Sequence, residues 1–381
     1  MKRFFAVLLA ALTLLLPVSA MEWDPEDPML WEPDLPDFGS VPENVQPWEV
    51  PVTEDHPLLW EPDLPEFDGP VPRTGETPES FKIVMSFTGD MLLASFYGKR
   101  TPGSFLDYAA KKEPTYFLQN VRPVFEADDF TVVNLENVIT DQPLTERPKT
   151  TTPAFWFKAG SSTTEILTSS SVEAVSLANN HSNDYGTQGY LDTIKAVTKA
   201  GLDYGGNDRT FYLEKNGYRI AVICNGLWSE DQAAAIIQRI KAAEVESDFQ
   251  IVFYHGGAEA VHKPEEWRVR ASRRLIDNGA DLVLGNHAHV LQPREIYKGK
   301  EIIYSLGNFC FGGNSKPRNR TIIYQFTLQI DNGQLTDAAA EILPCYVYTA
   351  ATNNYCPALI TNEAERQRVL DFMDGKLALP Y

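Results

Sequence analysis

Residues 279–292 read GADLVLGNHAHVLQ. The apolar run Leu282-Val283-Leu284 has the composition of a short buried β-strand, and the pair His287-x-His289 follows it almost at once. Strands that end in ligand-type side chains are typical of α/β proteins, because parallel strands bring their carboxyl ends to one edge of a sheet. The stretch therefore predicts both a fold class and the place to look for a functional site.

Four other β-branched, apolar runs end in the same kind of residue. They are residues 82–88 before Gly89-Asp90, 130–133 before Asn134-Leu135-Glu136, 174–177 before Asn179-Asn180-His181, and 250–254 before His255-Gly256-Gly257. Helical patterns at 188–200 and 265–278, each followed by a glycine, lie between these runs, so several strands can be parallel with helical crossovers. We expect an α/β domain in which the five strand ends converge.

The side chains at these ends are carboxylates, amides and imidazoles, and they include four of the six histidines in the chain. A lone aspartate or asparagine at such a point usually forms a turn or a cap. The joint pattern is harder to explain in that way. Oxygen and imidazole ligands without thiolates suit divalent ions such as Mn, Fe, Zn or Mg, so the strand ends predict a metal site.

Charge and proline are concentrated in one segment. The chain of 381 residues has 52 acidic and 33 basic residues, and its net charge of −19 argues against general nucleic-acid binding. Residues 21–80 hold 17 of those acidic residues, one basic residue and 13 of the 26 prolines. Proline at this density removes helix and ladder hydrogen bonds, so residues 21–80 are predicted to be a disordered acidic, proline-rich linker.

The linker contains a tandem repeat built around WEPDLP, because residues 28–42 recur at 57–72. The favoured interpretation is a self-repelling spacer that crosses a cell wall. The alternative is a two-copy docking motif in which Trp31 and Trp60 anchor a partner bivalently.

The first 20 residues have the features of a secretory signal. Lys2 and Arg3 precede an apolar run at 4–16, and Val18-Ser19-Ala20 offers small residues at a cleavage site. The run is shorter than the roughly 20 apolar residues of a membrane-spanning helix. We expect residues 1–20 to be a cleaved signal peptide and the protein to be exported, either secreted or associated with the cell envelope; an uncleaved anchor is the alternative.

Four cysteines in an exported chain permit disulfides. Cys224 and Cys310 lie in apolar runs and are predicted to be buried thiols, whereas Cys345 and Cys356 are the pair to test for a bridge. Of the remaining side chains, His262 is expected on a surface loop, with a place in the pocket as the alternative.

Six ordered segments of the chain resemble the CapA family of bacterial capsule-synthesis proteins, which is named for poly-γ-glutamate capsule production and belongs to the calcineurin-like metallophosphatase superfamily. The segments are FTGDMLL at 87–93, NLENVIT at 134–140, LANNHSNDYGTQGYLDT at 177–193, HGGAE at 255–259, GADLVLGNHAHVLQ at 279–292 and YSLGNFCF at 304–311. The resemblance implies a four-layer metallophosphatase-like sandwich, with two mixed β-sheets flanked by helices, at 81–345. Residues 346–381 would be a C-terminal extension packed on that domain.

The resemblance also implies a centre for one or two divalent metal ions. The implied ligands are Asp90, Glu136, Asn180, His255, His287 and His289. Glu136 would take the bridging position, and Leu92 stands where the superfamily usually has a histidine, which leaves the first metal short of a ligand. His181 would protonate a leaving group or stabilise charge in the transition state, with Asp184 as the displaced acidic residue beside it.

These features lead to an expected function. The protein would act in the biosynthesis, export or anchoring of an anionic envelope polymer such as poly-γ-glutamate, as a metal-dependent hydrolase of the phosphoester type. The alternative is a non-catalytic, metal-binding scaffold of a polymer-synthesis complex. The expected partners are the polymer or its precursor and membrane polymer-synthesis proteins, and no nucleic acid.

Overall fold

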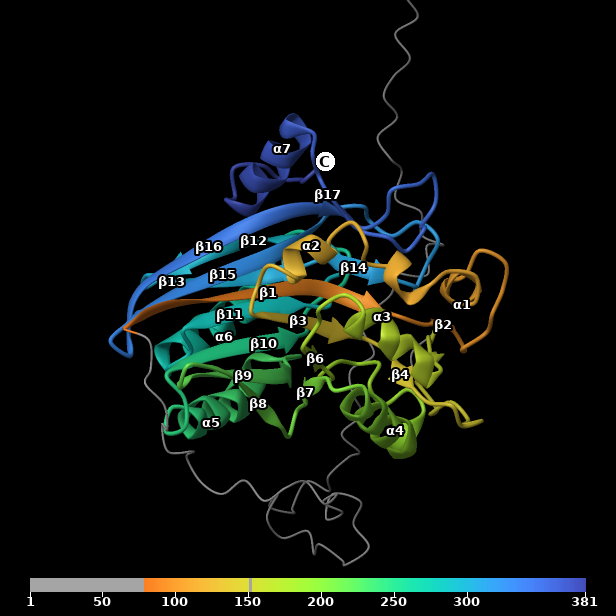
Figure 1. Cartoon of the computed structure of the whole chain (residues 1–381), viewed down its shortest axis with the longest axis horizontal. Coiled ribbons are helices and arrows are strands. Elements are labelled where there is room, and N and C mark those ends of the chain that lie inside the picture. Colours follow the sequence, from red (N-terminus) through yellow and green to blue (C-terminus); the bar gives the residue numbers. More distant parts are fainter. Residues whose placement is uncertain (1–78, 151–152) are drawn as a thin grey trace, which may run out of the picture.

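The computed structural model describes residues 79–150 and 153–381 (Figure 1). The predicted signal peptide at 1–20, the tandem repeat with Trp31 and Trp60, and all but the last two residues of the 21–80 linker lie outside the described residues. Within the described ranges, no helix is long and apolar enough to cross a membrane.

The first large sheet has eight strands in the order β17-β16-β15-β1-β3-β6-β7, with β14 pairing to the end of β1. Its strands are β1 (Ser80–Leu92), β3 (Phe130–Leu135), β6 (Ala174–Ser176), β7 (Asp203–Gly205), β14 (Asn308–Phe311), β15 (Thr321–Asp331), β16 (Gln334–Tyr346) and β17 (Ala358–Leu359). β1, β3, β6 and β7 run parallel, whereas β15 pairs antiparallel with β1. The sheet is therefore mixed.

The second large sheet has six strands in the order β12-β13-β11-β10-β9-β8. They are β8 (Thr210–Lys215), β9 (Tyr218–Gly226), β10 (Phe249–His255), β11 (Leu282–Asn286), β12 (Leu291–Tyr297) and β13 (Lys300–Leu306). The four central strands are parallel and the two edge strands antiparallel. A third, small sheet of β2 (Ser95–Phe96), β5 (Phe157–Ala159) and β4 (Val138–Ile139) was not expected.

The two large sheets face each other across the main core. Phe87 of β1 and Phe253 of β10 meet there edge to face, with ring centroids 5.5 Å apart. On the far side of β10, Val252 and Tyr254 pack under helices instead. Because both faces of the central strands are buried, these strands are continuous apolar runs in the sequence and not alternating ones.

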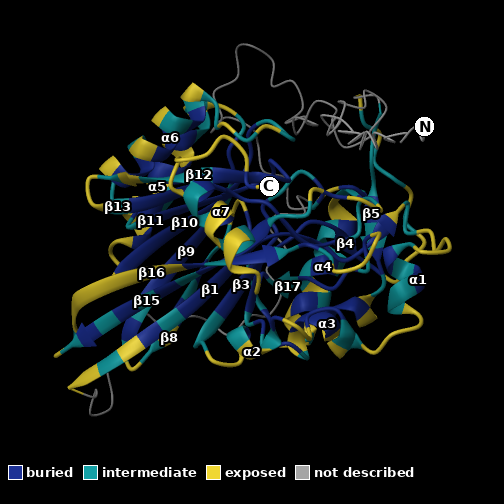
Figure 2. Cartoon of the chain, turned by 90° about the horizontal axis from the view of Figure 1, so that it is seen from above, coloured by how far each residue is buried: buried dark blue, intermediate teal, exposed yellow. Residues whose placement is uncertain are grey.

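Helices cover both outer faces, as Figure 2 shows. α5 (Ala233–Ala243) and α6 (Glu266–Asp277) lie over the six-stranded sheet, and α1 (Phe105–Ala109), α2 (Arg122–Phe125), α3 (Thr164–Thr168) and α4 (Gly186–Lys199) over the eight-stranded one. α7 (Glu363–Met373) contacts β12 and β16. The prediction of a mixed α/β fold with several sheets and helices is confirmed.

The five predicted strands and the two predicted helices are present. The predicted helix at 188–200 is α4, and Gly201 follows it with φ +84°, a conformation that glycine adopts at little cost. Three of the strand ends belong to the eight-stranded sheet (β1, β3, β6) and two to the six-stranded sheet (β10, β11). The ligand-type residues therefore meet across two sheets and not along one edge.

All four cysteines are buried and free. This confirms the prediction for Cys224 and Cys310, and there is no bridge between Cys345 and Cys356. Cys356 instead packs its sulfur against the side-chain amide of Asn120, 3.1 Å away. His262 is half-buried: it contacts the carbonyl oxygen of Leu291 and the hydroxyl of Tyr381.

Candidate metal centre

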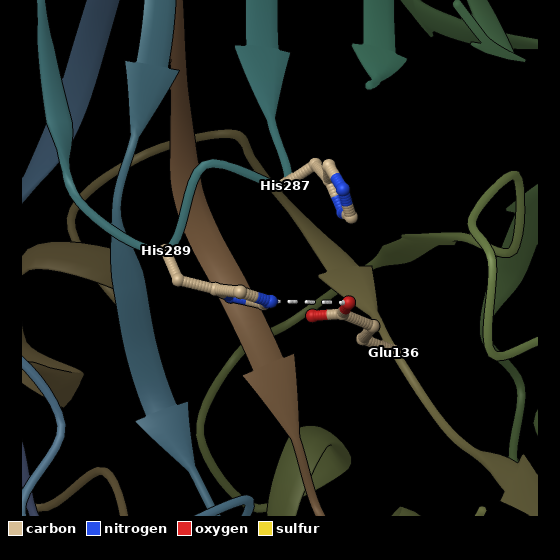
Figure 3. Close-up of side chains that lie close together, drawn as sticks. All are labelled: Glu136, His287 and His289. Atoms are coloured by element: carbon tan, nitrogen blue, oxygen red, sulfur yellow. Dashed lines mark ion pairs between the residues drawn. The ribbon is translucent and has the colours of Figure 1, made fainter. Parts of the chain in front are cut away.

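The carboxyl-terminal parts of β1, β3, β10 and β11, together with the residues that follow β3 and β11, hold a buried cluster of carboxylates and imidazoles. Figure 3 shows its centre, where His289 points toward Glu136 and His287 extends from the same loop as His289. Glu136, His287 and His289 each offer one ligand atom, and these atoms lie within 4.8 Å of one another. Among the described residues, this is a group that could hold a metal ion.

The backbone is unusual at the points that carry the ligands. At Gly89, an added Cβ would lie 1.8 Å from the carbonyl oxygen of Gly307, so only glycine allows β1 to approach this closely. That approach lets the N–H of Asp90 donate to the same oxygen at 2.8 Å. His287 and His289 both have positive φ, +88° and +53°, a conformation that is uncommon for residues other than glycine.

Asp90 is fully buried and is contacted from several elements. Its Oδ1 accepts a hydrogen bond from Nδ2 of Asn134 at 2.8 Å, and its Oδ2 lies 3.1 Å from Nδ1 of His289 and accepts from the backbone N–H of His287 at 3.2 Å. Burial alone would raise the pKa of Asp90, but hydrogen bonds and charge from His255 and His289 hold that pKa well below its usual range.

Glu136 is also fully buried but lacks such partners. Its Oε1 lies 3.3 Å from Nε2 of His255 and 3.8 Å from Nε2 of His289, and neither of its oxygens accepts a hydrogen bond from the described residues. A buried carboxylate without hydrogen bonds is costly unless a cation compensates it. The environment of Glu136 therefore fits a bound cation.

The imidazoles of β10 and the β11 loop converge on one point. Nε2 of His255 lies 3.0 Å from Nδ1 of His287 and 2.9 Å from Oδ1 of Asn180. Burial lowers the pKa of both rings. The charges of Glu136 and Asp90 outweigh burial at His255 and raise its pKa to about 9, whereas positive charge on its histidine neighbours lowers the pKa of His287 further.

His289 completes the cluster from the side of β14. Its Nδ1 contacts Oδ1 of Asn308 at 2.8 Å, and its ring packs against Phe311. Burial lowers its pKa, but the charge of Glu136 and a hydrogen bond to Asp90 raise that pKa to about 10. The cluster thus attracts positive charge strongly. Its donors are carboxylates, an amide oxygen and imidazoles, which suits divalent ions of the Mn, Fe, Zn or Mg kind.

His181 and Asp184 form a separate pair next to Asn180. Nδ1 of His181 lies 2.8 Å from Oδ2 of Asp184, which also accepts the backbone N–H of Phe157 at 2.7 Å. Oδ1 of Asp184 pairs with the buried ammonium of Lys149 at 2.9 Å. The ring of His181 packs edge to face on Phe157. This arrangement holds the imidazole in one orientation.

All six predicted ligands are therefore buried or half-buried in one region and linked by short contacts, and the predicted His181–Asp184 pair is formed beside them. Sequence reasoning missed other residues of the site: Asn134, Trp228, Glu259, Arg268 and Asn308. Asn134, Glu259 and Asn308 lie inside the motifs quoted above, so their position in those motifs was the available signal. Trp228, whose ring stands edge-on to His287 at 4.8 Å, and the buried Arg268 had none.

Comparison with known proteins agrees with the sequence motifs. Residues 84–313 match the family model for the bacterial capsule synthesis protein PGA_cap. The chain is 27% identical over 319 residues to the PGA biosynthesis protein CapA of Bacillus subtilis (strain 168), which covers 77% of this chain and 80% of that protein. It is also 27% identical over 327 residues to the capsule biosynthesis protein CapA of Bacillus anthracis, which covers 78% and 76%.

Among solved structures, a phosphatase of Mycoplasma pneumoniae matches with a TM-score of 0.38 and 14% identity, over 69% of this chain and 94% of that one. A TM-score of 0.38 does not establish a shared fold.

Proposed function

The chain belongs to the bacterial capsule synthesis protein PGA_cap family, and from that premise we propose that it acts in the biosynthesis of a capsule polymer of the polyglutamate kind. Relatives named for PGA and capsule biosynthesis align with more than three quarters of the chain, which supports this role. We further propose that the chain is a metal-dependent hydrolase of the phosphoester type with a metallophosphatase-like fold.

The observation that carries the hydrolase proposal is the buried carboxylate of Glu136. It accepts no hydrogen bond from the described residues and faces the rings of His255 and His289, which supports a bound cation at this site. Asp90, Glu136, Asn180, His255, His287 and His289 would hold it. A divalent ion in such a site supplies Lewis-acid chemistry and makes hydroxide available near neutral pH.

The chain's own residues supply the proton chemistry. Asp184 accepts a hydrogen bond from Nδ1 of His181, so the proton that the imidazolium form of the ring can give away is the one on Nε2. In phosphoester hydrolysis the oxygen of water bonds to phosphorus, the bond from phosphorus to the leaving oxygen breaks, and His181 gives its Nε2 proton to that oxygen. The proton released by the attacking water restores the imidazolium of His181. The carboxylate of Asp184 stabilises the imidazolium that precedes this transfer.

A non-catalytic scaffold is the second candidate, and one residue favours it. Leu92 occupies the place of the superfamily histidine, and it is fully buried among Ala94, Phe157 and Phe311. No imidazole can enter at that point, so one metal would be bound through fewer ligands. A site with one firmly held ion could serve structure or ligand binding instead of hydrolysis.

We also propose that the protein is exported and works with membrane polymer-synthesis proteins on an anionic envelope polymer. The charged start, the apolar run at 4–16 and Val18-Ser19-Ala20 support export. Terminal sequencing of the mature protein tests it: a chain that starts at Met21 is expected, and an intact residue 1–20 segment on membrane-bound protein would show an anchor instead.

Metal analysis and a substrate panel test the main proposal. After chelation and reloading with Mn or Zn, we expect between one and two ions per chain, with His287→Ala or Asn180→Ala removing the tighter ion and Asp90→Ala mainly the weaker. His181→Ala should keep the metal and lower phosphoester hydrolysis by about 100- to 10,000-fold. Metal retained by a His255→Ala, His287→Ala double variant would refute the site. Metal binding without hydrolysis of any phosphoester would favour the scaffold.

A further inference from the structure

The two ring nitrogens of His287 have different surroundings. Its Nδ1 faces Nε2 of His255 at 3.0 Å, whereas its own Nε2 is buried and has no hydrogen-bond partner among the described residues. The edge-on ring of Trp228 restricts the plane of the imidazole but offers no acceptor to Nε2. A buried ring nitrogen without a partner calls for a group that accepts its proton.

The carboxylate that faces this nitrogen belongs to Glu259. Its Oε1 lies 3.7 Å from Nε2 of His287, and its side chain is only 14% exposed. Glu259 is not one of the six candidate ligands. Metal-bound histidines generally donate their second N–H to a carboxylate or a carbonyl oxygen, which fixes the tautomer and the orientation of the ring. Glu259 stands where such an acceptor would be needed.

The loop that carries Glu259 is fixed on both sides of it. The N–H of Ala258 donates to Oε1 of Glu265 at 2.6 Å. The N–H of Ala260 donates to the carbonyl oxygen of Ala288, at 2.9 Å, and Ala288 is the residue between His287 and His289. The position of Glu259 is thus tied directly to the backbone of the two histidines.

Arg268 contacts the same loop through its guanidinium group. Its guanidinium is fully buried, donates to the carbonyl oxygen of Gly256 at 2.6 Å and pairs with Oε2 of Glu265 at 2.9 Å. It also donates to the side chain of Gln292, whose amide in turn donates to the carbonyl oxygen of Val261 at 2.6 Å. An added Cβ on Gly257 would lie 2.1 Å from the guanidinium, so loop and arginine fit closely. The planar guanidinium of arginine carries several N–H donors, so it can bind several acceptors at once.

We propose that Glu259 is a positioning residue that accepts the Nε2 proton of His287, so that Nδ1 of His287 keeps its lone pair for a metal ion in the cluster. Arg268 supports this role because it fixes the loop that presents the carboxylate. The inference rests on the metal centre of the proposed function but adds a residue and a defined tautomer to it.

The test uses the full chain after a chelator has removed its metal. Mn²⁺ or Zn²⁺ is then titrated into the protein, and calorimetry measures the binding. Glu259→Gln keeps the size of the side chain and removes its charge, and we expect it to weaken the tighter site by about 10- to 100-fold. Glu259→Ala should weaken it at least as much. The matched control is Glu266→Gln, an exposed glutamate at the start of α6, which should bind metal as the wild type does. Circular dichroism of the metal-free variants checks that they are folded.

A second measurement reports on the tautomer. In the Zn-loaded protein, the ¹⁵N spectrum of labelled histidine should show His287 protonated at Nε2, with the signal assigned from a His287→Gln sample. If Glu259→Ala, which leaves no acceptor at this position, binds metal as tightly as Glu266→Gln, or if His287 is protonated at Nδ1, the role of Glu259 is wrong while the metal centre stands. If the wild type binds no metal, the metal centre and this inference are both wrong.

Discussion

The buried carboxylate of Asp184 has several partners, so its substitution should lower the stability of the fold strongly. It accepts hydrogen bonds from His181 and the backbone of Phe157 and pairs with Lys149, whose side chain is 6% exposed. Asp184→Asn would remove the negative charge from this buried ion pair and weaken the hydrogen bonds that the carboxylate accepts from His181 and Phe157. We expect the free energy of unfolding, measured in urea, to fall by about 3–5 kcal/mol, the usual cost of breaking a buried pair from one side.

A double variant separates this electrostatic cost from simple loss of packing. Adding Lys149→Met to Asp184→Asn removes the other charge of the pair, so the double variant should be more stable than the sum of the two single losses predicts. Glu126→Gln serves as the control, because Glu126 pairs with Arg122 at the surface, where ion pairs contribute about 0–1 kcal/mol. Additive losses at Asp184 and Lys149 would mean that their charges are not coupled.

Single residues were predictable from sequence when a recognisable strand preceded them. Asp90, Glu136 and His255 lie at or just beyond such strands, so their place at one end of the molecule followed from the strand pattern. Glu259 lies inside the HGGAE motif, but the motif does not show that it meets His287, which another loop carries. Lys149 lies outside the quoted motifs and meets Asp184 only through the tertiary fold. The roles of the six candidate ligands remain predictions until metal binding is measured.

At the scale of elements, the junction of β1 with the Gly307 turn sets the position of Asp90. Gly89→Ala would place a methyl group 1.8 Å from the carbonyl oxygen of Gly307. Both groups belong to the backbone, so relieving this clash requires a strand or turn to move. We expect β1 to move away, the hydrogen bond from the N–H of Asp90 to be lost, and both the melting temperature and metal affinity to fall. Thermal unfolding and metal titration measure the two effects.

Gly160→Ala is the matched control for that variant. An added Cβ on Gly160 meets only the side chain of Asp141, at 3.0 Å, and the residue has an ordinary φ of −76°. Its melting temperature should change little. If Gly89→Ala bound metal like Gly160→Ala, the close approach of β1 to Gly307 would not be what positions Asp90.

The elements themselves were predictable to different degrees. Long apolar runs such as β1 and β10 were recognised because both of their faces are buried. β2 and β4 have two residues each, too few for any periodicity, so the small sheet could not be anticipated. The division of the five strand ends between two sheets also could not be read from local patterns, since it depends on which strands pair, and that is decided by packing across the core.

At the scale of the whole molecule, a second set of carboxylates, half-buried, lies at the opposite ends of the strands. Asp128 precedes β3, and Glu173 precedes β6 and accepts from the backbone N–H of Thr131 at 2.7 Å. Burial raises the pKa of Asp128 to about 6, and burial together with the charge of Asp128 raises that of Glu173 to about 7. Nearby, Asp129 is neutralised by Lys215.

These raised pKa values predict how stability depends on pH. The folded state binds the protons more tightly than the unfolded chain, whose carboxyls titrate near pH 4, so the stabilisation is complete below about pH 4 and is lost as pH rises through about 7. With chelator present, the free energy of unfolding should fall between pH 5 and pH 8.

Glu173→Gln removes one of the two groups, so the free energy of unfolding of this variant should fall less steeply with pH than that of the wild type. At pH 8 it should be the more stable protein, by about 1 kcal/mol once the partial exposure of Glu173 is discounted. Urea unfolding at each pH measures this, with the exposed Glu214→Gln as the control. Parallel curves for Glu173→Gln and the wild type would show that Glu173 is ionised in the folded protein throughout this range.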